Sequence, residues 1–170
     1  MDKSIILVVD SNKIIIKIIE NALGEVSYHI ISAQNGREGL NKLNNFNVDL
    51  VIADQALPDM TGMEFLKIAK NEYPDIITIM FAGQVDLKTT IRAINESGLY
   101  KFVLKPWNAF DLRITISRAM ELKEINIEKK RLLGEIRKNE ALFEILGNKY
   151  PELLVVLNEG ARDLEIELIR

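Results

Sequence analysis

Cysteine is absent from this sequence of 170 residues, and histidine occurs once, as His29. Without thiols the chain has no disulfide, no thiolate-bound zinc or iron–sulfur cluster and no cysteine nucleophile. A single imidazole excludes any site that needs several histidines, and we interpret His29 as a structural residue of a strand. The lack of cysteine suits a reducing compartment, so we expect a cytoplasmic protein.

A large charge of one sign and a long hydrophobic run are missing too. The 22 basic and 25 acidic residues give a formal net charge of −3, spread evenly along the chain. Binding to a phosphate backbone needs a positive excess, so we expect no direct contact with nucleic acid. Only a short apolar run, residues 5–9, precedes Asp10. It is too short for a signal peptide or a membrane span, so we expect no membrane association.

Apolar residues make up 48% of the chain, which is enough for one good core. Up to Trp107, short apolar runs alternate with segments of helical spacing. This alternation predicts an α/β fold in which a five-stranded parallel sheet carries helices on both faces. The predicted strands cover residues 5–9, 28–33, 49–53, 76–81 and 100–104, and the predicted helices cover residues 13–23, 35–43, 63–71 and 87–97.

A different pattern follows Trp107, which we interpret as a packing residue. Residues 108–146 contain no proline and a single glycine, and Asn108 is suited to cap a helix. Apolar side chains then recur at coiled-coil spacing, which predicts an extended helix over residues 121–147 and a homodimer formed through it. Six of eight core positions are apolar (Leu122, Ile125, Leu132, Ile136, Phe143 and Leu146), and the exceptions are Lys129 and Asn139.

The tail, residues 148–170, has a third pattern. The segment from Gly147 to Pro151 is expected to break the helix, and a β-like run and an alternating run flank a turn near Gly160. These features favour a small β-hairpin over a helix. A hairpin alone is marginally stable, so it would dock on the long helix or on a partner chain. We therefore divide the chain into a domain of residues 1–120, the helix and the tail, and a further domain beyond Arg170 stays open.

Charged side chains follow three of the predicted strands: Asp10 the first, Asp54 the third and Lys105 the fifth. In a doubly wound parallel sheet these strand ends meet at one edge, where ligands bind. A carboxylate can attack phosphorus to form an acyl phosphate, and Mg²⁺ prefers carboxylate and water ligands. A lysine can hold a phosphoryl oxygen as a point charge. The cluster therefore indicates phosphoryl chemistry on an aspartate.

The motifs around this cluster resemble those of the CheY-like receiver domains of response regulators in two-component signalling. The resemblance covers residues 5 to about 120 and rests on residues 6–10, 49–54, 57–63 and 102–107. The run from Ala93 through Trp107 is similar to receivers that precede HD-GYP-type output domains. The resemblance implies a flavodoxin-like sheet with strand order 2-1-3-4-5.

The resemblance also implies roles for individual residues. Asp54 aligns with the phosphoacceptor, which receives its phosphoryl group from a histidine kinase or phosphotransfer protein. Lys105, with the positions of Ala82 and Gly83, aligns with the residues that bind the phosphoryl group. Phe102 aligns with the aromatic switch that links phosphorylation to conformational change or dimerisation.

The implied Mg²⁺ site consists of Asp10, Asp54 and the backbone carbonyl of Ala56, and here the chain departs from the family. Ser11 stands where the family has a second acid, which removes a charge and a strong ligand. Ala82 stands where the family has Thr or Ser, and loss of a hydrogen bond to a charged group costs about 1.5–3 kcal/mol. Ser11 and Ala82 are therefore degenerate positions, and both the metal site and the switch are expected to be weakened.

Two functions remain open on these residues. The first is a working phosphoacceptor receiver, which Asp10 and Lys105 favour. The second is a degenerate receiver that binds partners or dimerises without phosphorylation, which Ser11 and Ala82 favour. An aspartate-nucleophile phosphatase would need an acid two residues after Asp10, and Asn12 cannot act as one. We therefore expect a signalling module and not an enzyme.

Overall fold

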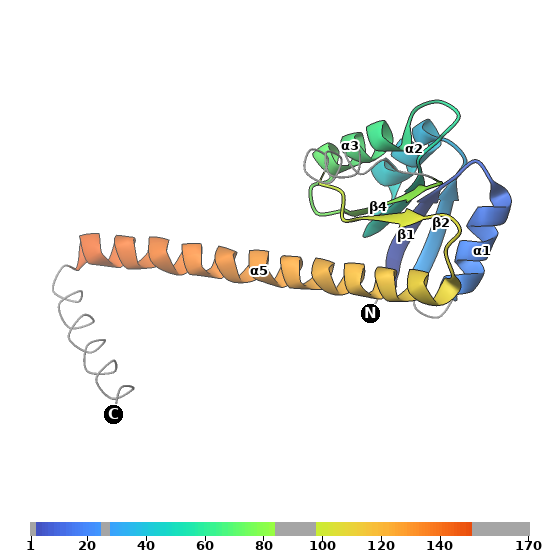
Figure 1. Ribbon diagram of the computed structural model, residues 1–170. Coiled ribbons are helices and arrows are strands. Elements are labelled where there is room, and N and C mark those ends of the chain that lie inside the picture. The colour runs from blue at the N-terminus through green and yellow to red at the C-terminus, as the bar shows by residue number, and fades with distance from the viewer. Residues whose placement is uncertain (1–2, 25–27, 84–97, 151–170) are drawn as a thin grey trace. The chain divides into compact units, whose positions relative to one another are not determined.

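The computed structural model describes residues 3–24, 28–83 and 98–150. Its centre is a parallel sheet of five strands in the order β2-β1-β3-β4-β5 (Figure 1). The predicted α/β fold and strand order are therefore confirmed. The strands are β1 Ser4–Val9, β2 Tyr28–Ala33, β3 Leu50–Asp54, β4 Ile77–Ala82 and β5 Lys101–Leu104.

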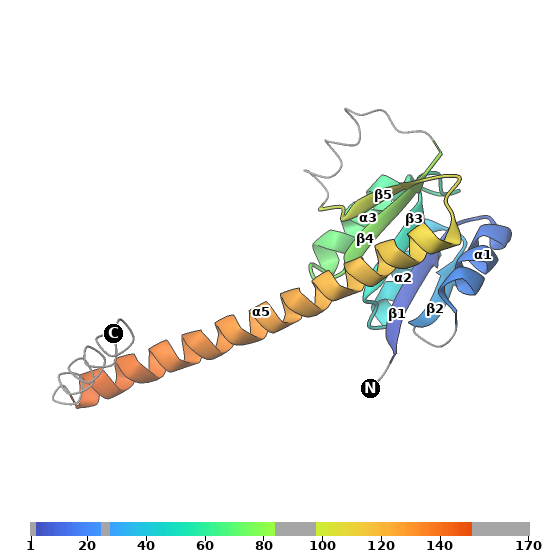
Figure 2. The same ribbon diagram turned by 60° about the horizontal axis from the view of Figure 1, so that its bottom comes forward.

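Among the described residues, helices cover both faces of the sheet (Figure 2). The helix α1 (Lys13–Leu23) and the first turns of α5 (Ala109–Lys149) pack on one face. The opposite face carries α2 (Gly36–Asn45) and α3 (Gly62–Glu72). The predicted helix over residues 87–97 lies outside the described residues.

The central strand β1 shows why the continuous apolar runs form buried strands. Successive side chains of a strand point to opposite faces, so a strand covered on both faces needs an apolar residue at every position. Ile6 and Val8 enter the core under α1 and α5, while Leu7 and Val9 enter the core under α2 and α3. All four are at most 1% exposed.

Side-chain caps fix where the helices begin at the carboxyl edge of the sheet. Asn12 Oδ1 accepts the Ile14 N–H at 2.9 Å at the start of α1. Thr61 and Glu64 form a reciprocal capping box at the start of α3. Each such cap satisfies a backbone donor that the first helical turn leaves without a partner. The caps thereby set the position of the loops that carry the candidate site.

The helix α5 begins after Asn108, whose Oδ1 accepts the Asp111 N–H at 2.8 Å as a capping residue does. It continues to Lys149, two residues beyond the predicted end, and runs through Gly147 without a break. The chain divides into two compact units, Met1–Asn126 and Ile127–Arg170, so the helix belongs to both. The predicted hairpin lies outside the described residues from residue 151 onward.

Candidate functional site

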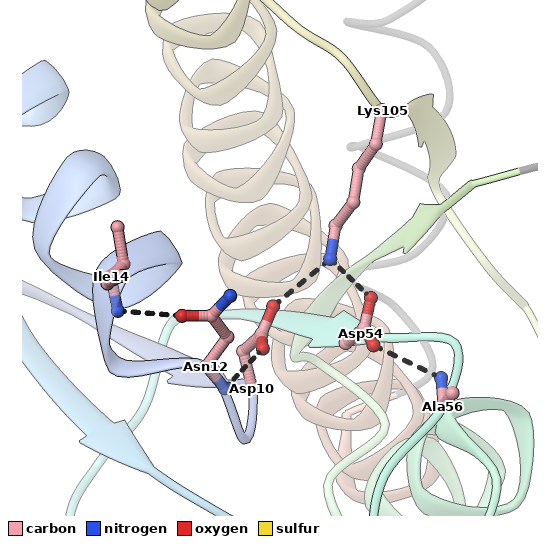
Figure 3. A network of polar contacts seen from close by, with 6 residues as sticks. All are labelled: Asp10, Asn12, Ile14, Asp54, Ala56 and Lys105. Atoms are coloured by element: carbon pink, nitrogen blue, oxygen red, sulfur yellow. Dashed lines mark hydrogen bonds and ion pairs between the residues drawn. The ribbon is translucent and has the colours of Figure 1, made fainter.

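Asp10, Asp54 and Lys105 converge at the carboxyl edge of the sheet, as Figure 3 shows. Lys105 Nζ lies 2.6 Å from Asp54 Oδ1 and 3.2 Å from Asp10 Oδ2. Asp10 follows β1, Asp54 ends β3 and Lys105 follows β5. The structure thus brings together the three charged residues that the strand ends predict, and the ammonium bridges both carboxylates.

This cluster is shielded from water but not closed. The side chains of Asp10, Asp54 and Lys105 are 4%, 17% and 27% exposed. Burial by itself would lower the pKa of Lys105, but the hydrogen bond to Asp54 and the charges of Asp10 and Asp54 outweigh it and raise that pKa. One cation faces two acids, so the cluster carries an excess of negative charge that favours binding of a further cation.

Both oxygens of the Asp10 carboxylate are engaged. Oδ2 contacts Lys105, and Oδ1 accepts the backbone N–H of Asn12 at 2.8 Å. Asn12 in turn caps α1, so the turn after β1 holds Asp10 in place (Figure 3). Asn12 therefore acts here as a positioning residue, a role that the sequence prediction did not give it.

Asp54 is held by the loop that follows it. Its Oδ2 accepts the Ala56 N–H at 3.3 Å, while Oδ1 contacts Lys105. The loop closes through the Gly62 N–H, which donates to the Gln55 carbonyl at 2.8 Å. A Cβ atom at Gly62 would lie 2.0 Å from the Asp54 carbonyl oxygen, so only glycine fits there. Gly62 belongs to the receiver-like motif of residues 57–63, but its close approach to the Asp54 backbone could not be inferred from the spacing of residues.

The same loop is tied to α2 by Asp59, which the sequence prediction missed as a site residue. Its two carboxylate oxygens accept the N–H groups of Gly36 and Arg37 at 2.8 and 2.9 Å. These backbone hydrogen bonds, that of Arg37 first, hold the pKa of Asp59 below its ordinary value. An acidic residue at a helix N-terminus is stabilised in this way. The loop after Asp54 is therefore fixed at both ends.

The predicted phosphoryl-binding and switch positions lie beside this cluster. Ala82 ends β4 and is fully buried, and its carbonyl accepts the Lys105 N–H at 2.8 Å. Gly83 is exposed directly after it. Phe102 is half-buried on β5 and lines a cavity of about 640 Å³ together with Met80 and residues of the loop after Asp54.

One aromatic ring lies near the lysine ammonium, and a second ring packs on the first. The rings of Phe81 and Trp107 lie 5.3 Å apart, and Lys105 Nζ is 6.0 Å from the Phe81 ring centre. Trp107 packs against the core under α1 and α5, as its interpretation as a packing residue predicts. Phe81 was not singled out from the sequence, because it reads there as one more apolar residue of a buried strand.

The donor set for a metal ion is small. Asp10 and Asp54 provide carboxylates, and Ala56 provides a backbone carbonyl in the same loop. Ser11 is exposed in the turn after β1 and adds no charge. Within residues 3–24, 28–83 and 98–150, no group of three or more His, Cys, Asp or Glu side chains could hold a metal ion. Mg²⁺ is commonly bound by one or two carboxylates with water and phosphate, so these donors fit a weak site.

The sequence profile of the response regulator receiver domain family matches residues 6–117. The hydrogenase transcriptional regulatory protein HoxA of Cupriavidus necator is 31% identical over 110 residues, which are 65% of this chain and 23% of HoxA. NtrC of Proteus hauseri is 26% identical over 179 residues, covering 99% of this chain and 38% of NtrC. The chain thus spans well under half the length of these relatives.

Solved structures agree with this match. The receiver domain of an HD domain-containing protein from Pseudomonas fluorescens has a TM-score of 0.68 and 32% identity, covering 72% of this chain and 98% of that domain. A CheY-like receiver from Methanospirillum hungatei has a TM-score of 0.69 and 29% identity, covering 74% and 99%. None of the described helices is long and apolar enough to cross a membrane. The profile match covers more than half of the sequence, and the chain belongs to the response regulator receiver domain family.

Proposed function

We propose that this receiver module of two-component signalling accepts a phosphoryl group on Asp54, supplied by a histidine kinase or a phosphotransfer protein. The observation that carries the proposal is the position of the Lys105 ammonium, 2.6 Å from Asp54 Oδ1 and 3.2 Å from Asp10 Oδ2. A lysine so placed offers positive charge to the phosphoryl oxygens as they arrive at Asp54.

The reaction is an in-line displacement at phosphorus. A carboxylate oxygen of Asp54 forms the new bond to phosphorus, and the bond from phosphorus to the donor nitrogen breaks, with the electron pair remaining on that nitrogen. Lys105 stabilises the added negative charge, and the Ala56 N–H holds the carboxylate in a fixed orientation. When bound by Asp10, Asp54 and the Ala56 carbonyl, Mg²⁺ would supply further neutralisation of the phosphoryl oxygens.

A second function is favoured by a specific observation at the end of β4. Ala82 is fully buried and presents a methyl group where a hydroxyl would contact a phosphoryl oxygen. Without that contact, phosphorylation is coupled more weakly to the conformation of Phe102. A degenerate receiver, which binds partners without phosphorylation, is therefore the alternative.

In both cases we propose a signalling module without catalytic turnover of its own. We also propose a cytoplasmic location, which the absence of cysteine fits.

The decisive test is intact-mass measurement after incubation with a small phosphodonor and Mg²⁺. We expect a gain of one phosphoryl mass, loss of that gain in Asp54→Asn, and strong slowing in Lys105→Met. Glu72→Gln is the matched control, because it removes an exposed carboxylate at the last residue of α3, outside the cluster of Asp10, Asp54 and Lys105. No mass gain in the wild type at high Mg²⁺ would favour the degenerate receiver.

We also propose that the chain forms a homodimer through the part of α5 beyond the first unit. Apolar side chains there are exposed to water, among them Ile136 at 52% and Phe143 at 54%. Sedimentation should give the mass of a dimer, and Ile136→Asp should give a monomer. Ile127→Asp is the control, since it makes the same substitution on the same helix at an equally exposed residue (52%) outside the predicted core positions.

A further inference from the structure

The apolar residues of α5 are unevenly placed along the helix. Leu122, the first predicted coiled-coil core position, packs partly on the core of the first unit. From Ile125 onward the core positions are solvent-exposed, with Ile125 at 63% and Leu132 at 45%. Exposed apolar area of this extent on one helix calls for a partner. The remaining core positions are Lys129, Ile136, Asn139, Phe143 and Leu146.

We propose that the second copy binds this helix in the antiparallel direction, with the two-fold axis beside Gly134. The inference rests on the proposed homodimer and adds its orientation. The heptad is symmetric about Gly134, so reversing one helix brings each core position opposite another core position of the partner. Orientation is therefore decided by which side chains face each other, since hydrophobic spacing alone permits both directions.

The two polar core positions separate the two directions. In the antiparallel register, Lys129 faces the partner's Asn139, so the ammonium donates to the amide oxygen. Ile125 then faces the partner's Phe143, and Leu132 faces the partner's Ile136, so apolar residues contact only apolar ones. In a parallel, in-register pair, Lys129 would face the partner's Lys129 inside the core. Two buried like charges are unfavourable, and this cost disfavours the parallel direction.

The residues that flank the core positions also favour the antiparallel direction. In the antiparallel register, Leu133 near the axis packs against the partner's Leu133, which accounts for an apolar residue that is 46% exposed outside the core positions. In a parallel pair, Leu133 would instead lie next to the partner's Glu128, and Glu135 next to the partner's Glu140. Like charges on adjacent flanks oppose pairing.

The antiparallel register does place Glu135 near the partner's Glu135. On its own helix, however, Arg131 binds both Glu128, at 2.7 Å, and Glu135, at 2.5 Å. The hydrogen bond to Glu128 comes first among the causes that raise the pKa of Arg131. This cation screens Glu135 in either direction of the partner, so repulsion between flanking glutamates is small compared with that of two buried lysines.

Disulfide cross-linking tests the direction directly, because the 170 residues contain no cysteine. Ile125→Cys and Phe143→Cys are made in differently tagged chains and co-expressed, and dimer mass is checked by sedimentation under reducing conditions. Under oxidation we expect a disulfide between the two different variants. Each variant alone should not cross-link, because its two cysteines would be about 27 Å apart along antiparallel helices.

Cross-linking of Ile125→Cys or Phe143→Cys with itself would mean a parallel pair and would overturn the inference, while the homodimer would stand. A dimer that forms no mixed disulfide would overturn it as well. A wild-type monomer would overturn both the homodimer and its orientation. Phosphorylation of Asp54 is measured by mass on the same protein, so its outcome is independent of all three.

A charge substitution gives a second test that needs no cross-link. In the antiparallel dimer Asn139→Glu faces the partner's Lys129, so the dimer dissociation constant should fall several-fold. In a parallel dimer the same substitution sets two glutamates opposite each other, and the constant should rise. Asn139→Gln is the uncharged control for helix propensity, and Asn139→Lys should weaken an antiparallel dimer. A weaker dimer with Asn139→Glu would overturn the inference.

Discussion

The strand β3 has a lysine–aspartate contact at each end, and the two contacts differ in charge balance. At the carboxyl end, Lys105 faces two carboxylates and is 27% exposed. At the amino end, Lys123 of α5 binds Asp49 at 2.8 Å and is only 9% exposed. Asp49 Oδ2 also accepts the Ile5 N–H at 2.8 Å, so the pair is balanced in charge and both carboxylate oxygens have partners. The balanced pair stabilises the fold, whereas the unbalanced cluster retains capacity for a ligand.

The largest effect on stability is expected at the balanced pair. Asp49→Asn leaves the buried Lys123 ammonium without its charge partner, which should lower the free energy of unfolding by about 3 kcal/mol. Denaturant unfolding measures this. The double variant Asp49→Asn, Lys123→Met should recover part of the loss, because it removes the uncompensated charge. A single variant as stable as the wild type would show that the pair does not anchor α5.

A smaller effect on stability is expected from Lys105→Met. The variant leaves the carboxylates of Asp10 and Asp54 facing each other, and it should lower the free energy of unfolding by about 1–2 kcal/mol. Adding Asp10→Asn to Lys105→Met should restore stability, as measured by denaturant unfolding. If the double variant is less stable than Lys105→Met, the two carboxylates do not repel each other in the folded chain.

The excess negative charge at the carboxyl edge can be increased by substitution. Ser11→Asp adds a carboxylate next to Asp10 and should strengthen Mg²⁺ binding by about tenfold, with Ser11→Asn as the uncharged control. Trp107 is the only tryptophan of the chain and contacts Phe81 beside Lys105, so its fluorescence should report binding. Equal affinities of Ser11→Asp and Ser11→Asn would exclude residue 11 as a metal ligand.

The smallest effect is a pH dependence. The pKa of Lys105 is raised in the folded chain, so its contribution to stability is complete below the pKa of an unfolded lysine, about 10.4. That contribution is lost as pH rises through the folded-state pKa. The difference in unfolding free energy between the wild type and Lys105→Met should therefore shrink at alkaline pH. A difference that stays constant up to the highest pH at which the chain is folded would contradict this linkage.

The carboxyl edge could be predicted from the sequence because the buried strands are unmistakable there. Once β1, β3 and β5 are assigned, Asp10, Asp54 and Lys105 must meet, since parallel strands end at one edge. The amino-end pair could not be predicted. Asp49 and Lys123 are 74 residues apart, no motif joins them, and their contact depends on how α5 lies on the sheet.

Close packing was also beyond the reach of the sequence. A Cβ at Gly62 would lie 2.0 Å from the Asp54 carbonyl oxygen, and this steric conflict depends on the path of the loop. The spacing of residues in the sequence does not define that path. The role of Leu122 illustrates the same limit. Heptad spacing predicts Leu122 in a coiled-coil core. In the structure Leu122 is partly buried against the core of the first unit, because the first turns of α5, from Ala109, pack on the sheet.

The backbone contact between β4 and the loop after β5 separates two properties of the receiver. The Lys105 N–H donates to the carbonyl of Ala82, so the lysine is positioned by main-chain atoms that every residue at position 82 would provide. A side-chain change at residue 82 that fits this buried position therefore leaves the backbone contact to the lysine in place. Under the proposed function, a hydroxyl gained or lost at position 82 would change the response to phosphorylation, while Lys105 would stay in place to assist the transfer.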